Sequence, residues 1–127
     1  MKLQNFFLDS NCVTKIGDFG MLKFCGTEAV LSSKLGTEEY MAPELLDPEC
    51  KEYLGLPVDI FALGINLFII HTARFPFQNC LKDWFYAKFQ KDPVKLAQKR
   101  NIIVNAEFLD LVRQMTAQNP QERPTLD

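Results

Sequence analysis

The sequence of 127 residues has little of what a metal centre or a disulfide framework needs. It contains one histidine, His71, and four cysteines that form no Cys-x-x-Cys pair. A structural zinc site needs four cysteine or histidine ligands at close spacing, so we expect no structural zinc. The cysteines show no disulfide pattern, and no signal peptide is recognisable at the start of the sequence. These absences favour an intracellular protein in a reducing compartment, the cytoplasm, with the nucleus as the alternative.

Strong charge and a long hydrophobic run are missing too. The formal net charge is −2, which gives no general attraction for nucleic acid. The most apolar segment, 58–73, is shorter than a membrane-spanning helix, which needs about 20 apolar residues. It also includes the polar residues Asp59, Asn66 and His71. Apolar side chains occupy nearly every angle of its helical wheel, so we expect a core helix that starts at Pro57, is buried on all sides and contacts no membrane.

What is present predicts a β-hairpin followed by a long loop. Segments 5–9 and 12–19 are rich in apolar and β-branched residues and flank the turn residues Ser10 and Asn11. Two such runs around a short polar turn are typical of a hairpin. The stretch 20–42 shows no regular pattern, and loops of this length are usually functional.

Helices are predicted for the rest of the chain. A short one starts at Pro43, because the fixed φ of proline suits the first helical position. An amphipathic helix covers 81–90, with Trp84, Phe85 and Phe89 as its anchors in the core.

The last third of the sequence contains the clearest helix and a basic segment. The helix covers 105–117, with Asn105 as a suitable N-cap. One face follows the helical spacing i, i+3, i+4, i+7 and consists of Phe108, Leu111, Val112 and Met115. The segment 82–100 has six Lys or Arg residues against two Asp. We interpret it as a solvated helix face, with a docking patch as the alternative.

Five short motifs follow one another in the sequence: "DFG" at 18–20, "GTEEYMAPE" at 36–44, "DIFALG" at 59–64, "FPF" at 75–77 and "ERPT" at 122–125. In this order they resemble the eukaryotic protein kinase family, of the serine/threonine type. The resemblance implies an α+β fold, the mainly helical C-terminal lobe of a kinase with a short β-hairpin and without the N-terminal lobe. Residues 1–127 would form a partial kinase domain, with an activation segment at 18–44 and a helical lobe at 43–127.

The resemblance also implies roles in phosphoryl transfer. The segment "KLQN" looks like the end of the catalytic loop, so Lys2 matches the lysine that steadies the transferring phosphate. Asn5 and Asp18 match the ligands of Mg²⁺, which prefers hard oxygen ligands. Phe7 would line the adenine of ATP, together with its neighbours. The implied cofactors of the complete kinase are therefore ATP and Mg²⁺, because phosphoryl transfer depends mainly on positioning and charge neutralisation.

The loop between the "DFG" and "APE" motifs would face the protein substrate. Thr37 matches the threonine that joins the catalytic aspartate and lysine through its hydroxyl group, and that marks serine/threonine specificity. Ser33 matches a frequent site of activating phosphorylation, and Lys23 matches a basic contact for that phosphate. Ser32 and Thr27 are open alternatives as phosphosites.

Two carboxylates are expected to support the lobe. Glu44 matches the glutamate that pairs with an arginine of the later "RP" motif, here Arg123. A planar guanidinium and a carboxylate suit a bidentate, partly buried pair. Asp59 resembles the helix aspartate that braces the catalytic loop from below, and Asn66 stands where the family packs an apolar residue.

Some family features are missing from these 127 residues. No His-Arg-Asp precedes Lys2, and no Gly-x-Gly-x-x-Gly phosphate loop occurs. General acid and base groups contribute about 10²–10⁴-fold to a rate, so this chain alone is expected to be inactive. The sequence thus predicts part of a serine/threonine kinase that acts on a protein substrate. The alternatives are a degenerate lobe that serves as a non-catalytic scaffold for a partner protein, and a nonfunctional fragment.

Overall fold

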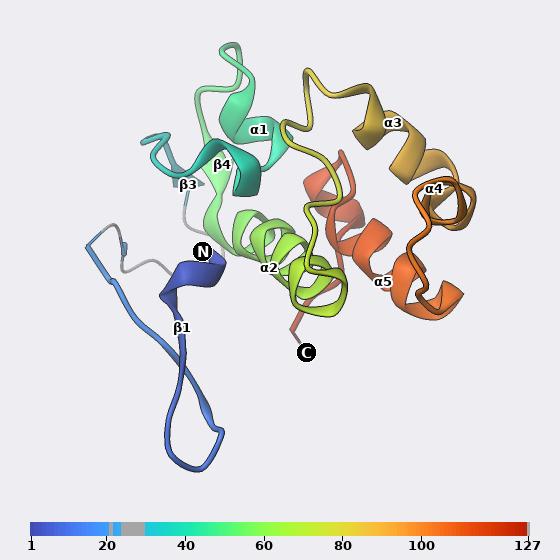
Figure 1. Cartoon of the computed structure of the whole chain (residues 1–127). Helices are drawn as coiled ribbons and strands as arrows, with labels where there is room; N and C mark the ends of the chain where they lie inside the picture. The colour runs from blue at the N-terminus through green and yellow to red at the C-terminus, as the bar shows by residue number, and fades with distance from the viewer. Residues whose placement is uncertain (21, 24–29, 127) are drawn as a thin grey trace.

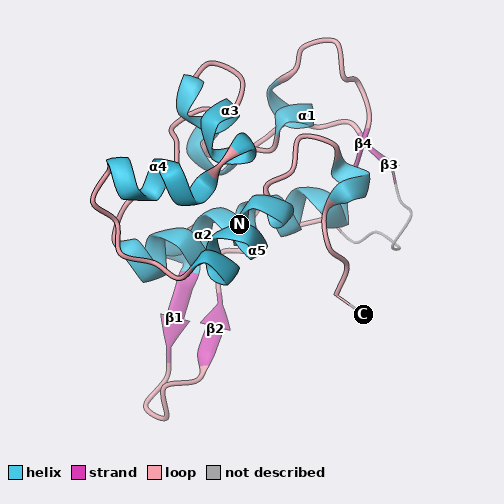
Figure 2. Cartoon of the chain, turned by 90° about the vertical axis from the view of Figure 1, so that its right-hand side faces the viewer, coloured by secondary structure: helices cyan, strands magenta, loops and turns pink. Residues whose placement is uncertain are grey.

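The computed structural model describes residues 1–20, 22–23 and 30–126. A β-hairpin extends from one side of a body of helices, and the two views agree on this arrangement (Figures 1 and 2). Helices and short antiparallel sheets together give the α+β fold that the sequence predicts. Thr27, one of the alternative phosphosites, lies outside the described residues.

The hairpin pairs β1 (Phe6–Leu8) with β2 (Thr14–Ile16) in antiparallel register. Its turn is held by the carboxylate of Asp9, which accepts hydrogen bonds from the backbone amides of Asn11 and Val13, both at 2.9 Å. A side chain that bonds the backbone ahead of it is a common device of tight turns. The hairpin prediction is confirmed, although both strands are shorter than the apolar runs.

The stretch after the hairpin is more regular than predicted. Val30–Leu31 forms β3, which pairs antiparallel with β4 (Tyr53–Leu54). A 3₁₀ turn, η2, covers Glu38–Tyr40, and the predicted short helix is α1 (Pro43–Leu46). Strands of two residues are too short to show an alternating pattern, and therefore the sequence did not reveal them.

The central helix is α2 (Gly55–Thr72), which begins two residues before the predicted start. Pro57 is tolerated there because the first amides of a helix have no partner within the helix. Phe61 and Ile65 are fully buried, whereas Ile70 is 62% exposed, so α2 buries a broad face and not its whole surface. By length and composition α2 could cross a membrane, but a core helix passes the same test, and α2 lies against α5 in the middle of the helical body (Figure 2).

The predicted amphipathic helix is α3 (Trp84–Lys91). Phe89 is 2% exposed and anchors α3 in the core, and Phe85 is partly buried against it. The prediction for Trp84 is wrong, because its side chain is 55% exposed. Tyr86 takes its place, because Tyr86 lies on the face of α3 that turns toward the body.

Two more helices complete the body. α4 (Pro93–Lys99) was not predicted as a separate helix, and α5 (Ala106–Met115) was. The carboxamide of Asn105 caps α5, as predicted, by accepting a hydrogen bond from the amide of Phe108 at 2.8 Å. The buried face of α5 consists of Leu109, Val112 and Met115, and Leu111 is exposed. The predicted face was therefore rotated by about one residue.

Candidate functional site

Two polar side chains meet at the base of the hairpin. Asn5 ends the 3₁₀ turn η1 (Leu3–Asn5), and Asp18 follows β2. The amide of Gly17 donates to the carbonyl oxygen of Asn5 at 2.8 Å, which extends the hairpin pairing to this point. As a result, Nδ2 of Asn5 lies 3.4 Å from Oδ2 of Asp18. The two residues that the sequence suggested as Mg²⁺ ligands are thus adjacent in space.

Asp18 has an unusual backbone and an open side chain. Its φ of 59° is in the left-handed region, which residues other than glycine rarely adopt and which is frequent at functional sites. Its carboxylate is exposed, and a carboxylate beside an amide offers the hard oxygen ligands that Mg²⁺ prefers. Within the described part of the chain no group of three His, Cys, Asp or Glu gathers around a common point. The pair therefore fits Mg²⁺ as a partial ligand set, which water and phosphate oxygens would complete.

Phe7 lies on the hairpin near this pair. Phe7 is 55% exposed, and its neighbour Leu8 is 70% exposed. The ring rests against Gly17, where an added Cβ would lie 2.7 Å from Cε2 of Phe7. Gly17 therefore makes room for an aromatic ring beside the Asn5–Asp18 pair, and any larger residue there would displace the ring.

Lys2 and Thr37 lie on separate elements. Lys2 precedes η1 and is partly buried, and Thr37 precedes η2 and is exposed. No hydrogen bond joins their side chains in the described structure. Asp59, on α2, has its Oδ1 3.9 Å from the amino group of Met1, next to Lys2, and its side chain is 57% exposed.

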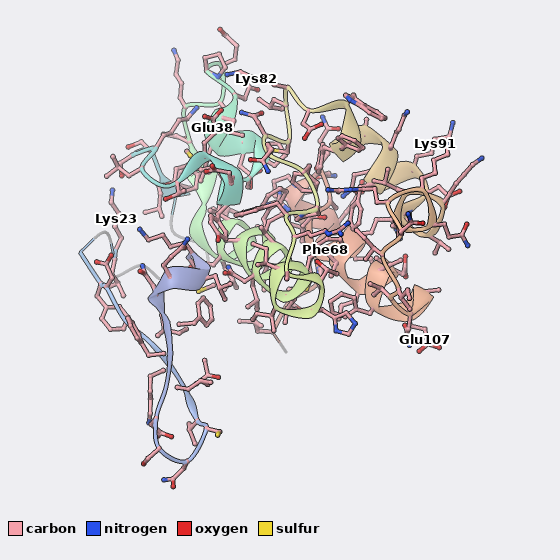
Figure 3. All side chains as sticks on the ribbon, in the orientation of Figure 1. Lys23, Glu38, Phe68, Lys82, Lys91 and Glu107 are labelled. Carbon is pink, nitrogen blue, oxygen red and sulfur yellow. The ribbon has the colours of Figure 1, made fainter. Side chains whose placement is uncertain are left out.

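Ser33 is held by two contacts. Nζ of Lys23 donates a hydrogen bond to Oγ of Ser33, and the hydroxyl of Tyr53 donates to the backbone oxygen of Ser33 at 2.6 Å. Ser33 is partly buried, whereas Ser32 is exposed. In Figure 3, Lys23 lies at the left of the molecule, above the hairpin. The lysine that the resemblance assigned to a loop phosphate is therefore in contact with Ser33.

Glu44 and Arg123 form a two-pronged ion pair between α1 and the last turn of the chain. Nη1 of Arg123 lies 2.6 Å from Oε1 of Glu44, and Nη2 lies 2.8 Å from Oε2. The side chain of Arg123 is 1% exposed and that of Glu44 is 10% exposed. Such a pair is strong because both hydrogen bonds are charge-assisted and shielded from water.

Arg123 has further partners that the sequence did not reveal. It follows the 3₁₀ turn η3 (Pro120–Glu122), and its Nε donates to the carbonyl oxygen of Ala117 at 2.9 Å. Its Nη1 also donates to the carbonyl oxygen of Pro57 at 2.9 Å, and its guanidinium carbon lies 5.1 Å from the centre of the Phe61 ring. The arginine therefore joins α1, the start of α2 and the end of the chain.

A second connection holds the loop that carries Thr37. The carboxamide of Asn79 donates to Oε1 of Glu38, and Nζ of Lys82 lies 3.7 Å from the same oxygen. Oδ1 of Asn79 accepts from the backbone amides of Leu81 and Lys82, both at 2.9 Å. Figure 3 shows Glu38 and Lys82 close together at the top of the molecule. The motifs of the sequence do not pair Glu38 with Asn79, which lie 41 residues apart.

Two buried side chains, Cys80 and Tyr86, have raised pKa values. Burial raises the pKa of the Cys80 thiol to about 12, and Sγ of Cys80 lies 3.4 Å from the carbonyl oxygen of Met41. Burial likewise raises the pKa of Tyr86, whose hydroxyl donates to the carbonyl oxygen of Thr116 at 2.9 Å. Both side chains therefore stay neutral, and neither is a candidate nucleophile.

Comparisons with known proteins agree with the motifs. A family model described as "Protein kinase domain" matches residues 1–127. The Saccharomyces cerevisiae protein YPL150W, a candidate serine/threonine-protein kinase, is 35% identical over 99% of this chain. The serine/threonine-protein kinase plk-1 of Caenorhabditis elegans is 31% identical over 98% of the chain, and ppk34 of Schizosaccharomyces pombe is 27% identical over 100%.

All three relatives are much longer proteins. The chain spans 13% of the length of YPL150W, 18% of plk-1 and 35% of ppk34. The similarity therefore concerns one portion of each relative.

Proposed function

The chain belongs to the protein kinase family, and we propose that it supplies the metal-binding and substrate-facing part of a serine/threonine protein kinase. In this role a phosphoryl group passes from ATP to a serine or threonine of a protein substrate, with Mg²⁺ as cofactor. The observation that carries the proposal is the contact between Asn5 and Asp18, whose side chains lie 3.4 Å apart at the base of the hairpin.

In this proposal the hairpin holds the nucleotide end of the reaction. Asp18 and Asn5 would hold Mg²⁺, and the ion would supply positive charge to the phosphates. Lys2 adds a positive charge three positions before Asn5. The exposed ring of Phe7 offers an apolar surface to the adenine base.

The loop around Thr37 holds the substrate end. Tyr40 is 5% exposed, and its ring packs edge-on against Phe75 with the centroids 5.5 Å apart. The contact of Glu38 with Asn79 fixes the same turn from the other side. Phe75 and Asn79 belong to the connection between α2 and α3, and both are largely buried against the core. They would therefore hold Thr37 in a fixed position toward a substrate, as precise positioning requires.

Ser33 is the proposed site of regulation. A phosphate on Ser33 would bring a charge of about −1.5 to −2 beside Lys23, which already contacts the hydroxyl, and would order the loop through charge-assisted hydrogen bonds. Peptide mapping of native protein tests this: phosphate is expected on Ser33, and active protein with unmodified Ser33 would refute the assignment.

The 127 residues by themselves are proposed to be inactive, because they contain no His-Arg-Asp and no glycine-rich phosphate loop. The alternative function is a non-catalytic scaffold that binds a partner protein. The proposed location is the cytoplasm, where the exposed thiol of Cys12 would remain reduced.

A chimeric kinase tests the reaction. This chain replaces the matching portion of plk-1, and transfer of labelled phosphate from ATP to a mixed protein substrate is measured. The expected result is incorporation into serine and threonine only. A chimera that is folded by circular dichroism but transfers no phosphate, while the parent does, would contradict the proposal and favour the scaffold.

A further inference from the structure

Helix α3 exposes an aromatic side chain and two lysines in a row. Trp84, Lys88 and Lys91 stand at positions i, i+4 and i+7, which place them on one face of a helix. All three are exposed, and Lys91 extends from the outer side of the molecule in Figure 3. These three residues are called the α3 basic stripe below. Trp84 is the one tryptophan of the sequence.

The indole ring of Trp84 is held in place by its own helix. Nζ of Lys88 lies 3.6 Å from the centre of the ring, and the Phe85 ring stacks on it with centroids 4.0 Å apart. The centre of the Phe85 ring in turn lies 5.2 Å from the guanidinium carbon of Arg100, the residue that follows α4. A ring that is fixed before binding loses little conformational entropy when a partner docks.

The positive charges on this side of the molecule are not neutralised locally. The two acidic residues of the segment 82–100 are N-caps: the carboxylate of Asp83 accepts from the amide of Phe85, and that of Asp92 accepts from the amide of Lys95. Of the six cations, Lys82 pairs with Glu38. Across the described residues no ion pair forms at Lys88, Lys91, Lys95 or Lys99.

The geometry points to a docking surface: we propose that the α3 basic stripe binds an acidic segment of a partner protein, with Trp84 packing against an apolar side chain of that segment. The lysines supply charge complementarity and the indole supplies the buried area, which is the usual division of roles in an interface. This surface is separate from the Asn5–Asp18 pair and does not depend on the proposed kinase reaction.

The charge of the remaining chain favours a short acidic peptide over a larger polyanion. The formal net charge is −2 for the whole chain and +4 for the segment 82–100, so the remaining residues together have a net charge of −6. A nucleic acid or an anionic membrane would extend beyond α3 and α4 and meet this negative remainder. A short acidic segment covers only the cationic side.

Intrinsic fluorescence tests the proposal, because Trp84 reports on its own surface. The purified chain is titrated with a synthetic peptide that is rich in Glu and Asp and contains one Leu. The control is a neutral peptide in which Gln replaces each Glu and Asn replaces each Asp. The expected result is a saturable change with the acidic peptide only, weakened by added salt. Lys91→Glu is expected to raise the dissociation constant by about tenfold. The matched control Lys51→Glu, at an exposed lysine before β4, is expected to leave it unchanged.

A second measurement keeps the role of the indole testable. With a dye-labelled acidic peptide, fluorescence anisotropy is expected to show weaker binding to Trp84→Ser than to the wild type. Equal binding by Lys91→Glu and Lys51→Glu, or no binding of the acidic peptide at all, would overturn the proposal. So would tighter binding of duplex DNA or of phosphatidylserine vesicles, or a concentration-dependent fluorescence change of the chain alone, which would assign the surface to another occupant.

Discussion

The guanidinium of Arg123 and the carboxylate of Glu44 face each other across 79 residues of sequence, with N–O distances of 2.6 Å and 2.8 Å. The pair ties the end of the loop that carries Thr37 to the last turn of the chain, because Glu44 lies in the first turn of α1, directly after that loop. Arg123 also bonds the backbone at Pro57 and Ala117, so one side chain supports three segments.

Arg123→Ala is expected to lower the free energy of unfolding by about 3–5 kcal/mol, because it leaves the Glu44 carboxylate unpaired in a buried position. Urea denaturation followed by circular dichroism measures the change. Arg113→Ala is the matched control, since Arg113 forms an exposed ion pair with Asp110 at 2.7 Å and should cost less than about 1 kcal/mol. An equal decrease in the free energy of unfolding for the two variants would show that the buried pair stabilises the protein no more than the exposed one.

Asn66→Leu is expected to stabilise the protein by about 1–2 kcal/mol. Asn66 is fully buried, and although its Nδ2 donates to the carbonyl oxygen of Ala62 at 2.6 Å, its Oδ1 has no partner in the described structure. Removing a buried unsatisfied oxygen recovers its desolvation cost. Asn79→Leu is the control and is expected to destabilise the protein, because both the nitrogen and the oxygen of the Asn79 carboxamide form hydrogen bonds that leucine cannot replace. A lower thermal midpoint for Asn66→Leu would mean that Oδ1 has an unseen partner.

Gly64→Ala is expected to destabilise the protein, although alanine favours a helix over glycine by about 1 kcal/mol. A Cβ at Gly64 would lie 2.9 Å from Cβ of Met115 and 3.0 Å from Cγ2 of Thr116, where α2 crosses α5. Overpacking of this kind costs about 1–3 kcal/mol. A thermal melt that rises instead would show that α2 and α5 can separate without loss.

Stability is expected to fall at alkaline pH. The pKa of Cys80 is about 12 in the folded protein, raised by burial from 9.0, so the folded state holds this proton more tightly than the unfolded state. The stabilisation is fully present below about pH 9 and is lost as the pH rises toward 12. Tyr86, whose pKa burial also raises, adds to the same trend.

Urea midpoints measured between neutral pH and pH 11 check this dependence. Cys80→Ala is expected to give a flatter curve than the wild type. Cys12→Ala, at an exposed cysteine on the hairpin turn, should leave the curve unchanged. If the wild type and Cys80→Ala lose stability in parallel above pH 9, the buried thiol is not a source of the effect.

Local signals predicted the local structure well. Asn105 and the spacing of apolar residues located α5, since an N-cap and a helical repeat act within a few residues. The same repeat assigned Leu111 to the core in place of Leu109, because the pattern does not state how α5 is rotated against α2. Trp84 was predicted to be an anchor of its amphipathic helix, yet its ring is exposed, and a lysine and a neighbouring ring cover part of it at the surface.

Contacts between distant segments could be predicted only where a family motif supplied them. The adjacency of Asn5 and Asp18 and the pairing of Glu44 with Arg123 followed from the resemblance. The contact between Glu38 and Asn79 did not, because it depends on how the loop before α3 folds back onto η2. Interactions of this kind arise from tertiary packing and leave no periodic trace in a sequence.

The most direct test of the account is the effect of Asp18→Ala on phosphoryl transfer by the chimeric kinase, compared with Asp110→Ala. Asp110 is an exposed aspartate on α5 that bonds Arg113 and Gln114 of the same helix. Asp18→Ala is expected to lower the rate of phosphoryl transfer by at least about 100-fold, because it removes a ligand of the metal ion that stabilises the charge on the phosphates. Asp110→Ala is expected to stay within about twofold of the parent chimera. A folded Asp18→Ala chimera with the activity of the Asp110→Ala control would contradict the assignment of the Asn5–Asp18 pair as the metal site.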